Sequence, residues 1–408
     1  MTSASEPDPP TAANAGHQSL AAGTAGHALL QLERANTGTG TWDAAHASIR
    51  RLAAGPLDGG EHTSLFYGVP AAAFVLHCAS EVDTRYRSAA AGLDPHVLRV
   101  ARRRQTAAAA RRQRGGTASF AEHDLFSGLT GIAALLLRRL PDSDTSVGTV
   151  GTVGDVLGDV LRHLVGLTEP RQQHGVPVPG WWVDHDPDPT LPTPGGHANL
   201  GMAHGAAGVL AVLAVALRRG YVVDHHTDAV DRLTAWFDRW RQPDTGLGTW
   251  WPQWLTLHEL TIGRSRQQHP GRPSWCYGTP GIARALHLAA IATGDPDRQH
   301  DAEHVLASCL TEQNLRLLNE PGLCHGLAGL YQTVNRAAAD ATTPALAQCL
   351  PALSAALDHA TSTAPAPAPA PSTTEGGLLN GRTGDQLAAH TARHGTPRTG
   401  WDTCLLIT

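Results

Sequence analysis

The chain has 408 residues, enough to bury a large core, so neither a disulfide nor a metal is needed merely to fold it. Its 41% hydrophobic and 16% charged content is typical of a globular protein, and a net charge of −5 gives no overall attraction for nucleic acid or an anionic membrane. The six cysteines are widely scattered without a Cys-x-x-Cys pair, which argues against a disulfide framework and favours a reducing, cytoplasmic compartment.

The N-terminal region does not read as a targeting signal. Residues 1–15 are polar and lack a basic stretch followed by an apolar core, so we expect a disordered tail. No apolar run anywhere reaches the roughly 18 residues that a membrane span requires. Residues 16–408 are expected to form a single domain.

A Gly-x-x-Gly pattern followed by an apolar helical segment recurs seven times along this domain. The first glycines of the copies are Gly23, Gly68, Gly128, Gly205, Gly278, Gly326 and Gly381. The second copy alone departs, with Ala71 in place of the later glycine. The helix after each copy is apolar nearly all round, as buried helices are, whereas intervening segments such as 228–242 and 301–314 are amphipathic. This alternation predicts an all-α fold, a double-layered α/α toroid of seven inner and seven outer helices.

Three stretches depart from the repeat. We expect insertions near 95–120 and 167–200; the first carries six arginines between residues 100 and 116 and suits a solvent-facing helix or loop. The second is polar and rich in proline where it approaches His204, so it is a candidate for the mouth of a site. The segment APAPAPAPS, 364–372, reads as a Pro-rich connector before the last copy.

Alignment of the seven copies places the two residues before each first glycine at equivalent positions on the rim where the inner helices begin. Three neighbouring copies bring His204, Cys276, Cys324 and His325 to this rim. Two thiolates and an imidazole suit zinc, so Cys276, Cys324 and His325 are the predicted metal ligands. Three protein ligands leave a fourth position open, which is the catalytic pattern. His204 is either a fourth ligand that closes a structural site or a free acid/base. The other four cysteines are expected in the core.

The rim loops contain AHG at 203–205, WCYGTPG at 275–281 and CHG at 324–326, and the chain ends in WDTCLLIT. These motifs resemble those of the lanthionine synthetase C-like family, the lanthipeptide cyclases. The resemblance implies an α/α toroid with one zinc ion per chain. It further implies a class I lanthionine synthetase, which adds cysteine thiols of a precursor peptide to dehydroalanine or dehydrobutyrine by Michael-type addition and so forms lanthionine or methyllanthionine.

The resemblance also implies roles for four further residues. His204 would supply the proton that the enolate needs, and Asp124 would orient or charge-stabilise it. Arg272 and Tyr277 match an arginine and a tyrosine of the family site, where they could stabilise the enolate oxygen. The alternatives are a helix-dipole interaction for Asp124, a surface charge for Arg272 and a packed aromatic for Tyr277.

The partners that the resemblance implies are a dehydrated precursor with its leader peptide, a separate dehydratase and a transporter. The location would be cytoplasmic, either free or at the membrane through that complex, and the arginines of 100–116 could dock acidic leader residues. Two other functions stay open. One is an enzyme that adds glutathione to dehydroamino acids, and the other is a peptide-binding scaffold with a structural zinc. Prenyltransferase β-subunits are also zinc toroids, but the Cys-Cys-His set and the AHG motif argue against them.

Overall fold

The computed structural model describes residues 18–140, 150–188, 190–243, 246, 248–318, 320–363 and 376–408. The predicted N-terminal tail, 1–15, and the Pro-rich connector, 364–372, lie outside these residues. Among the described residues, none of the helices combines the length and the apolar character needed to cross a bilayer.

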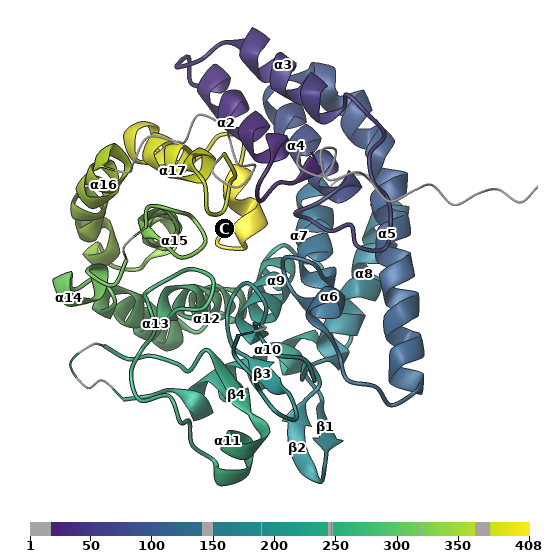
Figure 1. The fold of residues 1–408 in the computed structure, drawn as a ribbon, viewed down its shortest axis with the longest axis vertical. Coiled ribbons are helices and arrows are strands. Elements are labelled where there is room, and N and C mark those ends of the chain that lie inside the picture. Colours follow the sequence, from purple (N-terminus) through teal and green to yellow (C-terminus); the bar gives the residue numbers. More distant parts are fainter. Residues whose placement is uncertain are drawn as a thin grey trace, which may run out of the picture.

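Seven inner helices form a closed ring (Figure 1). Each begins at the residue after the first glycine of a repeat copy, and each packs against the next, with the last against the first. The inner helices are α2 (Thr24–Asn36), α4 (Val69–Val82), α7 (Leu129–Arg139), α9 (Ala206–Arg218), α12 (Thr279–Thr293), α15 (Leu327–Asp340) and α17 (Arg382–His394). The predicted helical toroid is therefore confirmed.

Among the described residues, six outer helices lie in the intervals between these seven inner helices. They are α3 (Trp42–Leu52), α5 (Arg87–Gln113), α8 (Val150–Gly166), α10 (His226–Trp240), α13 (Pro296–Ser308) and α16 (Ala345–Thr363). Short helical turns η2 (Thr84–Tyr86), α6 (Phe120–His123), α11 (Leu257–Ile262) and α14 (Glu312–Leu315) complete the connections. Much of the stretch expected as an insertion near 95–120 is the second half of α5, which continues through Pro95.

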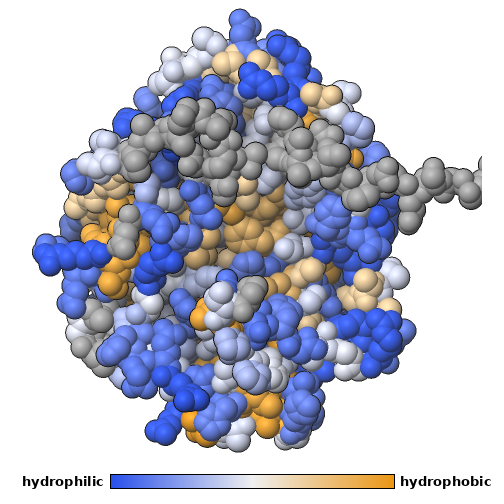
Figure 2. Space-filling view, in the orientation of Figure 1, coloured by the Kyte–Doolittle hydropathy of each residue, from blue (hydrophilic) through white to orange (hydrophobic). Residues whose placement is uncertain are grey.

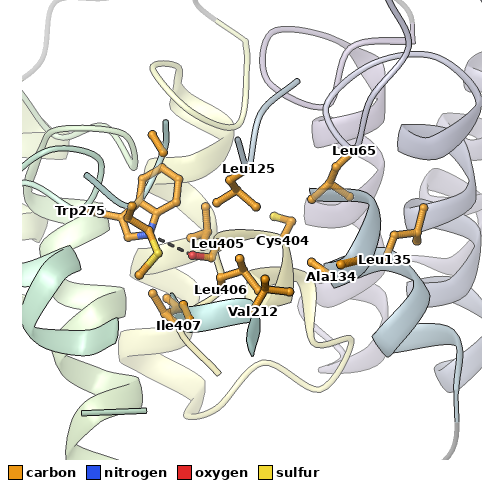
Figure 3. Packing of buried hydrophobic residues seen from close by; sticks show 14 of the residues in the cluster. Leu65, Leu125, Ala134, Leu135, Val212, Trp275, Cys404, Leu405, Leu406 and Ile407 are labelled. Carbon is orange, nitrogen blue, oxygen red and sulfur yellow. Dashed lines mark hydrogen bonds between the residues drawn. The ribbon is translucent and has the colours of Figure 1, made fainter. Parts of the chain in front are cut away.

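The chain after α17 turns inward, so the residues described there do not form the expected seventh outer helix. The 3-10 helix η3 (Trp401–Leu405) and the residues after it lie among the inner helices (Figure 3). Leu405 and Ile407 are fully buried, and the indole of Trp275 donates a hydrogen bond of 3.0 Å to the carbonyl of Leu405. This ending is apolar, so burial in the centre is more favourable for it than an exposed outer position.

Two small antiparallel sheets stand outside the helical layers. β1 (Pro170–Gln173) and β2 (Val176–Pro179) form a hairpin, and β3 (His197–Asn199) pairs with β4 (Trp254–Thr256), with His197 opposite Thr256. The stretch expected as an insertion at 167–200 thus contains β1, β2 and β3. Asn199, at the end of β3, leads directly into the loop that carries His204.

The later glycine of the repeat has a steric reason. A Cβ on Gly281 would lie 2.0 Å from the carbonyl oxygen of Trp275, and one on Gly329 would lie 1.9 Å from that of Leu323. In the six copies that keep this glycine, the loop before the helix folds back onto the first helical turn, and a Cβ there would lie no more than 2.7 Å from a carbonyl oxygen. The same loops carry Cys276 and Cys324, so the repeat positions the candidate ligands.

Candidate metal centre

Backbone hydrogen bonds join the loops before neighbouring inner helices at equivalent positions. The N–H of Ala203 donates to the carbonyl of Cys276 at 3.1 Å, and the N–H of Cys276 donates to that of Cys324 at 3.2 Å. The pattern continues from Cys324 to Leu379 at 2.9 Å and from Leu379 to Ala21 at 3.2 Å. This ladder sets the register of the loops, so the two cysteines from different copies lie side by side.

Cys276, Cys324 and His325 form a compact cluster of potential metal ligands. One ligand atom from each residue lies within 4.8 Å of the others. Ligand atoms around a tetrahedral zinc ion are about 3.3 to 3.8 Å apart, so adjustments of about an ångström would bring all three onto one ion. Cys276 is buried, whereas Cys324 and His325 are partly exposed. The cluster therefore opens to one side, where an additional ligand could approach.

The ionisation of these groups also fits a soft cation. A hydrogen bond with Cys324 holds the pKa of Cys276 well below its ordinary value, and His325 adds to this effect. The same contact raises the pKa of Cys324, and a hydrogen bond with Cys276 raises the pKa of His325. These hydrogen bonds thus favour the thiolate form of Cys276 even without a metal ion. A metal cation that bound here would replace the protons that the three side chains share.

Glu320, which the sequence reasoning missed, supports the histidine of this cluster. Its Oε2 lies 2.9 Å from Nε2 of His325, so Nδ1 is the ring nitrogen left to face the thiols. Carboxylates commonly orient metal-binding histidines in this way. Arg272 lies on the outer side of Glu320, with 3.5 Å between Nη1 and Oε1, and both side chains are about half exposed. Glu320 could have been found from the sequence as a carboxylate five residues before His325 in the same short loop.

His204 is not part of the ligand cluster and instead pairs with Asp124. Its Nδ1 lies 2.5 Å from Oδ2 of Asp124, whose side chain is fully buried, while His204 is 26% exposed. The other carboxylate oxygen of Asp124 accepts a hydrogen bond of 2.6 Å from the N–H of Ser127. Within the described chain only Nδ1 of His204 has a partner, so Nε2 is the nitrogen available to a ligand.

Aromatic rings hold the imidazole of His204 in place. It stacks between Phe120, at 4.9 Å between ring centroids, and Phe126, at 5.1 Å. Phe126 also stacks on Phe66 at 4.5 Å, so three of the five phenylalanines of the chain gather on this rim. Figure 2 shows hydrophobic residues in the hollow at the centre of this face. The clustering of these rings is not evident from the sequence, because it depends on loops from different copies.

Tyr277 lies on the same side as His204, with 5.8 Å between the two rings. Burial, and secondarily the nearby Cys276, raises the pKa of the Tyr277 phenol, so the hydroxyl remains a proton donor at neutral pH. The buried side chain of Asn199 acts in the opposite direction and partly offsets this rise of the pKa. The structure thus brings Asp124, His204 and Tyr277 together beside the ligands, with Arg272 at the edge.

The remaining cysteines lie outside this rim. Cys78, Cys309 and Cys404 are buried, as expected for core residues, whereas Cys349 is only half-buried on the outer helix α16. Outer helices present one face to solvent, and Cys349 lies at the margin of that face. No group of metal-ligating side chains other than Cys276, Cys324 and His325 is found among the described residues.

Comparisons with known proteins agree with the fold and the motifs. A solved structure of nisin cyclase superposes with a TM-score of 0.76 over 96% of this chain and 92% of that one, at 20% identity. Nisin biosynthesis protein NisC from Lactococcus lactis subsp. lactis is 29% identical over 140 residues, a match that spans 34% of this chain and only 33% of that relative. The family model described as lanthionine synthetase C-like protein matches residues 15–406. Because that match covers nearly the whole chain, the protein belongs to the lanthionine synthetase C-like family.

Proposed function

We propose that the protein is a zinc-dependent lanthipeptide cyclase of class I. Its substrate would be a precursor peptide that a separate dehydratase has already dehydrated, and it would close thioether rings between cysteine and dehydroalanine or dehydrobutyrine residues. One observation carries this proposal: a three-residue soft-metal cluster lies on the same rim as a His–Asp pair that is not part of it. The names of the relatives, nisin cyclase and nisin biosynthesis protein, support a peptide substrate.

Cys276, Cys324 and His325 would hold one zinc ion, and Glu320 would fix the ring of His325. When bound, zinc would supply a positive charge that keeps a thiol deprotonated at neutral pH. The partial exposure of Cys324 and His325 leaves room for a peptide to approach from the hollow.

His204 would act as the general acid/base that transfers the proton of the reaction. Ring closure breaks the S–H bond and one bond of the C=C, and it forms a C–S bond and a C–H bond, so a single proton moves from sulfur to the α-carbon. The buried carboxylate of Asp124 would stabilise the imidazolium form, and Nε2 would deliver the proton. Phe120 and Phe126 would hold the ring in the delivering orientation.

Tyr277 and Arg272 would stabilise the enolate oxygen before protonation. Tyr277 suits a donor role because its phenol is buried and stays protonated. Arg272 is half exposed and would have to move from Glu320 toward the substrate. The protein would act in the cytoplasm, either free or in a complex with the dehydratase and a membrane transporter.

The test is cyclisation of a dehydrated precursor by the zinc-loaded protein. Cyclisation changes no mass, so free thiols are counted by alkylation and mass spectrometry, and ring positions are read by fragmentation. We expect loss of thiols well above the spontaneous rate. A parallel reaction with excess glutathione tests the other enzymatic function, the addition of glutathione to dehydroamino acids. Each such addition would raise the mass of the peptide by one glutathione, whereas cyclisation would not change it. Full zinc binding without acceleration of either reaction would leave the scaffold function and refute the cyclase.

A further inference from the structure

The second half of α5 carries a positive charge that the surrounding structure does not balance. No Asp or Glu occurs between Asp94 and Glu122, whereas seven arginines do. Within the described chain, Arg111 is the one of these seven that forms an ion pair, with Glu122. On other outer helices, several arginines pair with carboxylates, as Arg298 of α13 does with Asp238 of α10. This helix therefore stands out in a protein whose overall charge is negative.

A groove of about 310 Å³ follows this helix. Its α5 side consists of Val100, Arg103, Arg104, Ala107, Ala108 and Arg111, and the segment 119–122 forms much of the opposite wall. The α5 residues are three or four positions apart, so they lie on one helix face. The groove thus has small apolar side chains along its middle and guanidinium groups at both ends. Its volume is at the lower end of the roughly 300 to 1,000 Å³ of ligand pockets.

Two of the groove arginines are anchored by neutral partners. Arg103 donates to the carbonyl oxygens of Gly59 and of Gly60, the latter at 3.1 Å. Arg104 donates to the carbonyl oxygens of Thr63 at 2.8 Å, of Glu61 at 3.1 Å and of Ala121. Carbonyl groups fix these side chains without cancelling their charge. Each guanidinium is therefore positioned and still able to attract a carboxylate.

The groove and the candidate active site share one short wall segment. Ala121 and Glu122 line the groove, while Phe120 and Asp124, in the same short segment, contact His204. Figure 1 shows α6, which begins this segment, between α5 and the start of α9. A chain that leaves the groove along this segment arrives beside His204. Whatever binds in the groove can therefore be part of the molecule that reacts on the rim.

We propose that this groove binds an acidic, non-reacting stretch of the peptide substrate, and the inference rests on the proposed cyclase function. Carboxylates of the peptide would face Arg103 and Arg104, whose charges no ion pair cancels among the described residues, and short aliphatic side chains would lie on the alanines. The carboxylates of Glu61 and Glu122 edge the groove, so a peptide with separate carboxylates that can meet the guanidinium groups fits better than the continuous phosphate surface of nucleic acid or an anionic membrane.

Ala107 provides the sharpest test, because it is exposed in the middle of the groove and forms no side-chain hydrogen bond that a variant would remove. Glu and Arg are both good helix formers, so Ala107→Glu and Ala107→Arg should fold alike while changing the charge in opposite directions. Ala355→Glu, at an exposed position of α16, is the matched control. The probe is a fluorescein-labelled peptide of Asp, Leu and Ala that contains no Ser, Thr or Cys and so cannot cyclise. Its twin has Asn for every Asp.

Fluorescence anisotropy with the full chain should show that the acidic probe binds and that its Asn twin binds at least about tenfold more weakly. Ala107→Glu should raise Kd roughly fivefold or more, Ala107→Arg should lower it, and Ala355→Glu should leave it unchanged. Raising the salt concentration should weaken binding. Equal binding of the two peptides, or equal effects of Ala107→Glu and Ala355→Glu, would overturn the proposal. So would tighter binding of a short RNA or of phosphatidylserine vesicles that Ala107→Glu abolishes.

This experiment separates the docking proposal from the cyclase proposal, because binding of the inert probe needs no turnover. Wild-type protein that cyclises a dehydrated acidic precursor but ignores the acidic probe would overturn docking alone. Protein that binds the probe with the expected charge dependence, yet never consumes thiols, would refute the cyclase and retain the groove as an acidic-peptide site.

Discussion

Replacing His204 with Asn should separate turnover from metal binding. Asn keeps a polar side chain between Phe120 and Phe126 but cannot carry a proton. A positioned acid/base contributes roughly 10²- to 10⁴-fold, or about 2.7 to 5.4 kcal/mol of activation free energy, so the cyclisation rate should fall by that factor. His204 is outside the ligand cluster, so one zinc per chain should remain.

The carboxylate partner gives an independent estimate of the same step. The 2.5 Å contact joins His204 to a fully buried Asp124, and Asp124→Asn would keep its shape but remove its charge. A hydrogen bond to a charged group is worth about 1.5 to 3 kcal/mol, so this variant should lose roughly 10- to 150-fold in rate, less than His204→Asn. The ordering of the two variants follows from His204 moving the proton and Asp124 acting through it.

The assay measures initial rates of thiol loss, with the spontaneous rate subtracted, and zinc by elemental analysis. His225→Asn is the matched control, because His225 also pairs through Nδ1 with an aspartate, Asp228 at 3.1 Å, but at the start of an outer helix. It should cyclise like wild type. A wild-type rate in His204→Asn would refute the proton role, and loss of zinc would make His204 a fourth ligand and favour a structural site.

Five further variants test the metal site and the fold. Cys276→Ala should lose nearly all zinc by elemental analysis yet still fold, with an unchanged far-UV circular dichroism spectrum, whereas a full equivalent of retained metal would contradict the ligand assignment. Glu320→Gln should weaken zinc affinity by about 10- to 100-fold in competition with a chelator, and unchanged affinity would remove Glu320 from the support of His325. Gly281→Ala should lower the free energy of unfolding by about 2 kcal/mol or more, since its Cβ would lie 2.0 Å from a carbonyl oxygen. Gly92→Ala, at a position with open space around it, should leave that free energy unchanged or raise it. Burial raises the pKa of Asp385 to about 7, so the free energy of unfolding of the wild-type protein should fall as pH rises from about 4 to 7. Asp385→Asn should remove this pH-dependent loss. Parallel curves of unfolding free energy against pH for the variant and the wild type would contradict the prediction.

The inner layer was predictable because its signal is local. Each inner helix begins directly after the first glycine of a repeat copy, and the clash that a Cβ would make at Gly281 explains why glycine recurs at the later position. Aligning the copies was enough to select Cys276, Cys324 and His325, since a repeating loop brings equivalent residues to equivalent places. No such signal existed for the apolar ending, whose burial in the centre depends on the space that the closed ring leaves.

The surroundings of the site were harder to predict, because they too leave no local signal in the sequence. Phe120 and Glu320 lie in loops outside the repeated motif, and their orientation depends on contacts with His204 and His325 that no spacing encodes. The arginines of α5 were visible as a charge pattern, but the sequence could not show that Arg103 and Arg104 bond to carbonyl oxygens and so keep their charge uncompensated.

The backbone ladder on the rim gives a physical reason to expect that side-chain variants will act separately. Leu125, next to Asp124, donates its N–H to Ala203, Ala203 donates to Cys276, and Cys276 donates to Cys324. Main-chain bonds, and not the reacting side chains, therefore set the spacing between the acid/base pair and the ligand cluster. Removing the His204 imidazole leaves every rung in place, so zinc binding should survive it. A substitution that displaces one loop should instead impair metal binding and turnover together. Gly281→Ala is an example, because its Cβ would push on the carbonyl of Trp275, the residue before Cys276.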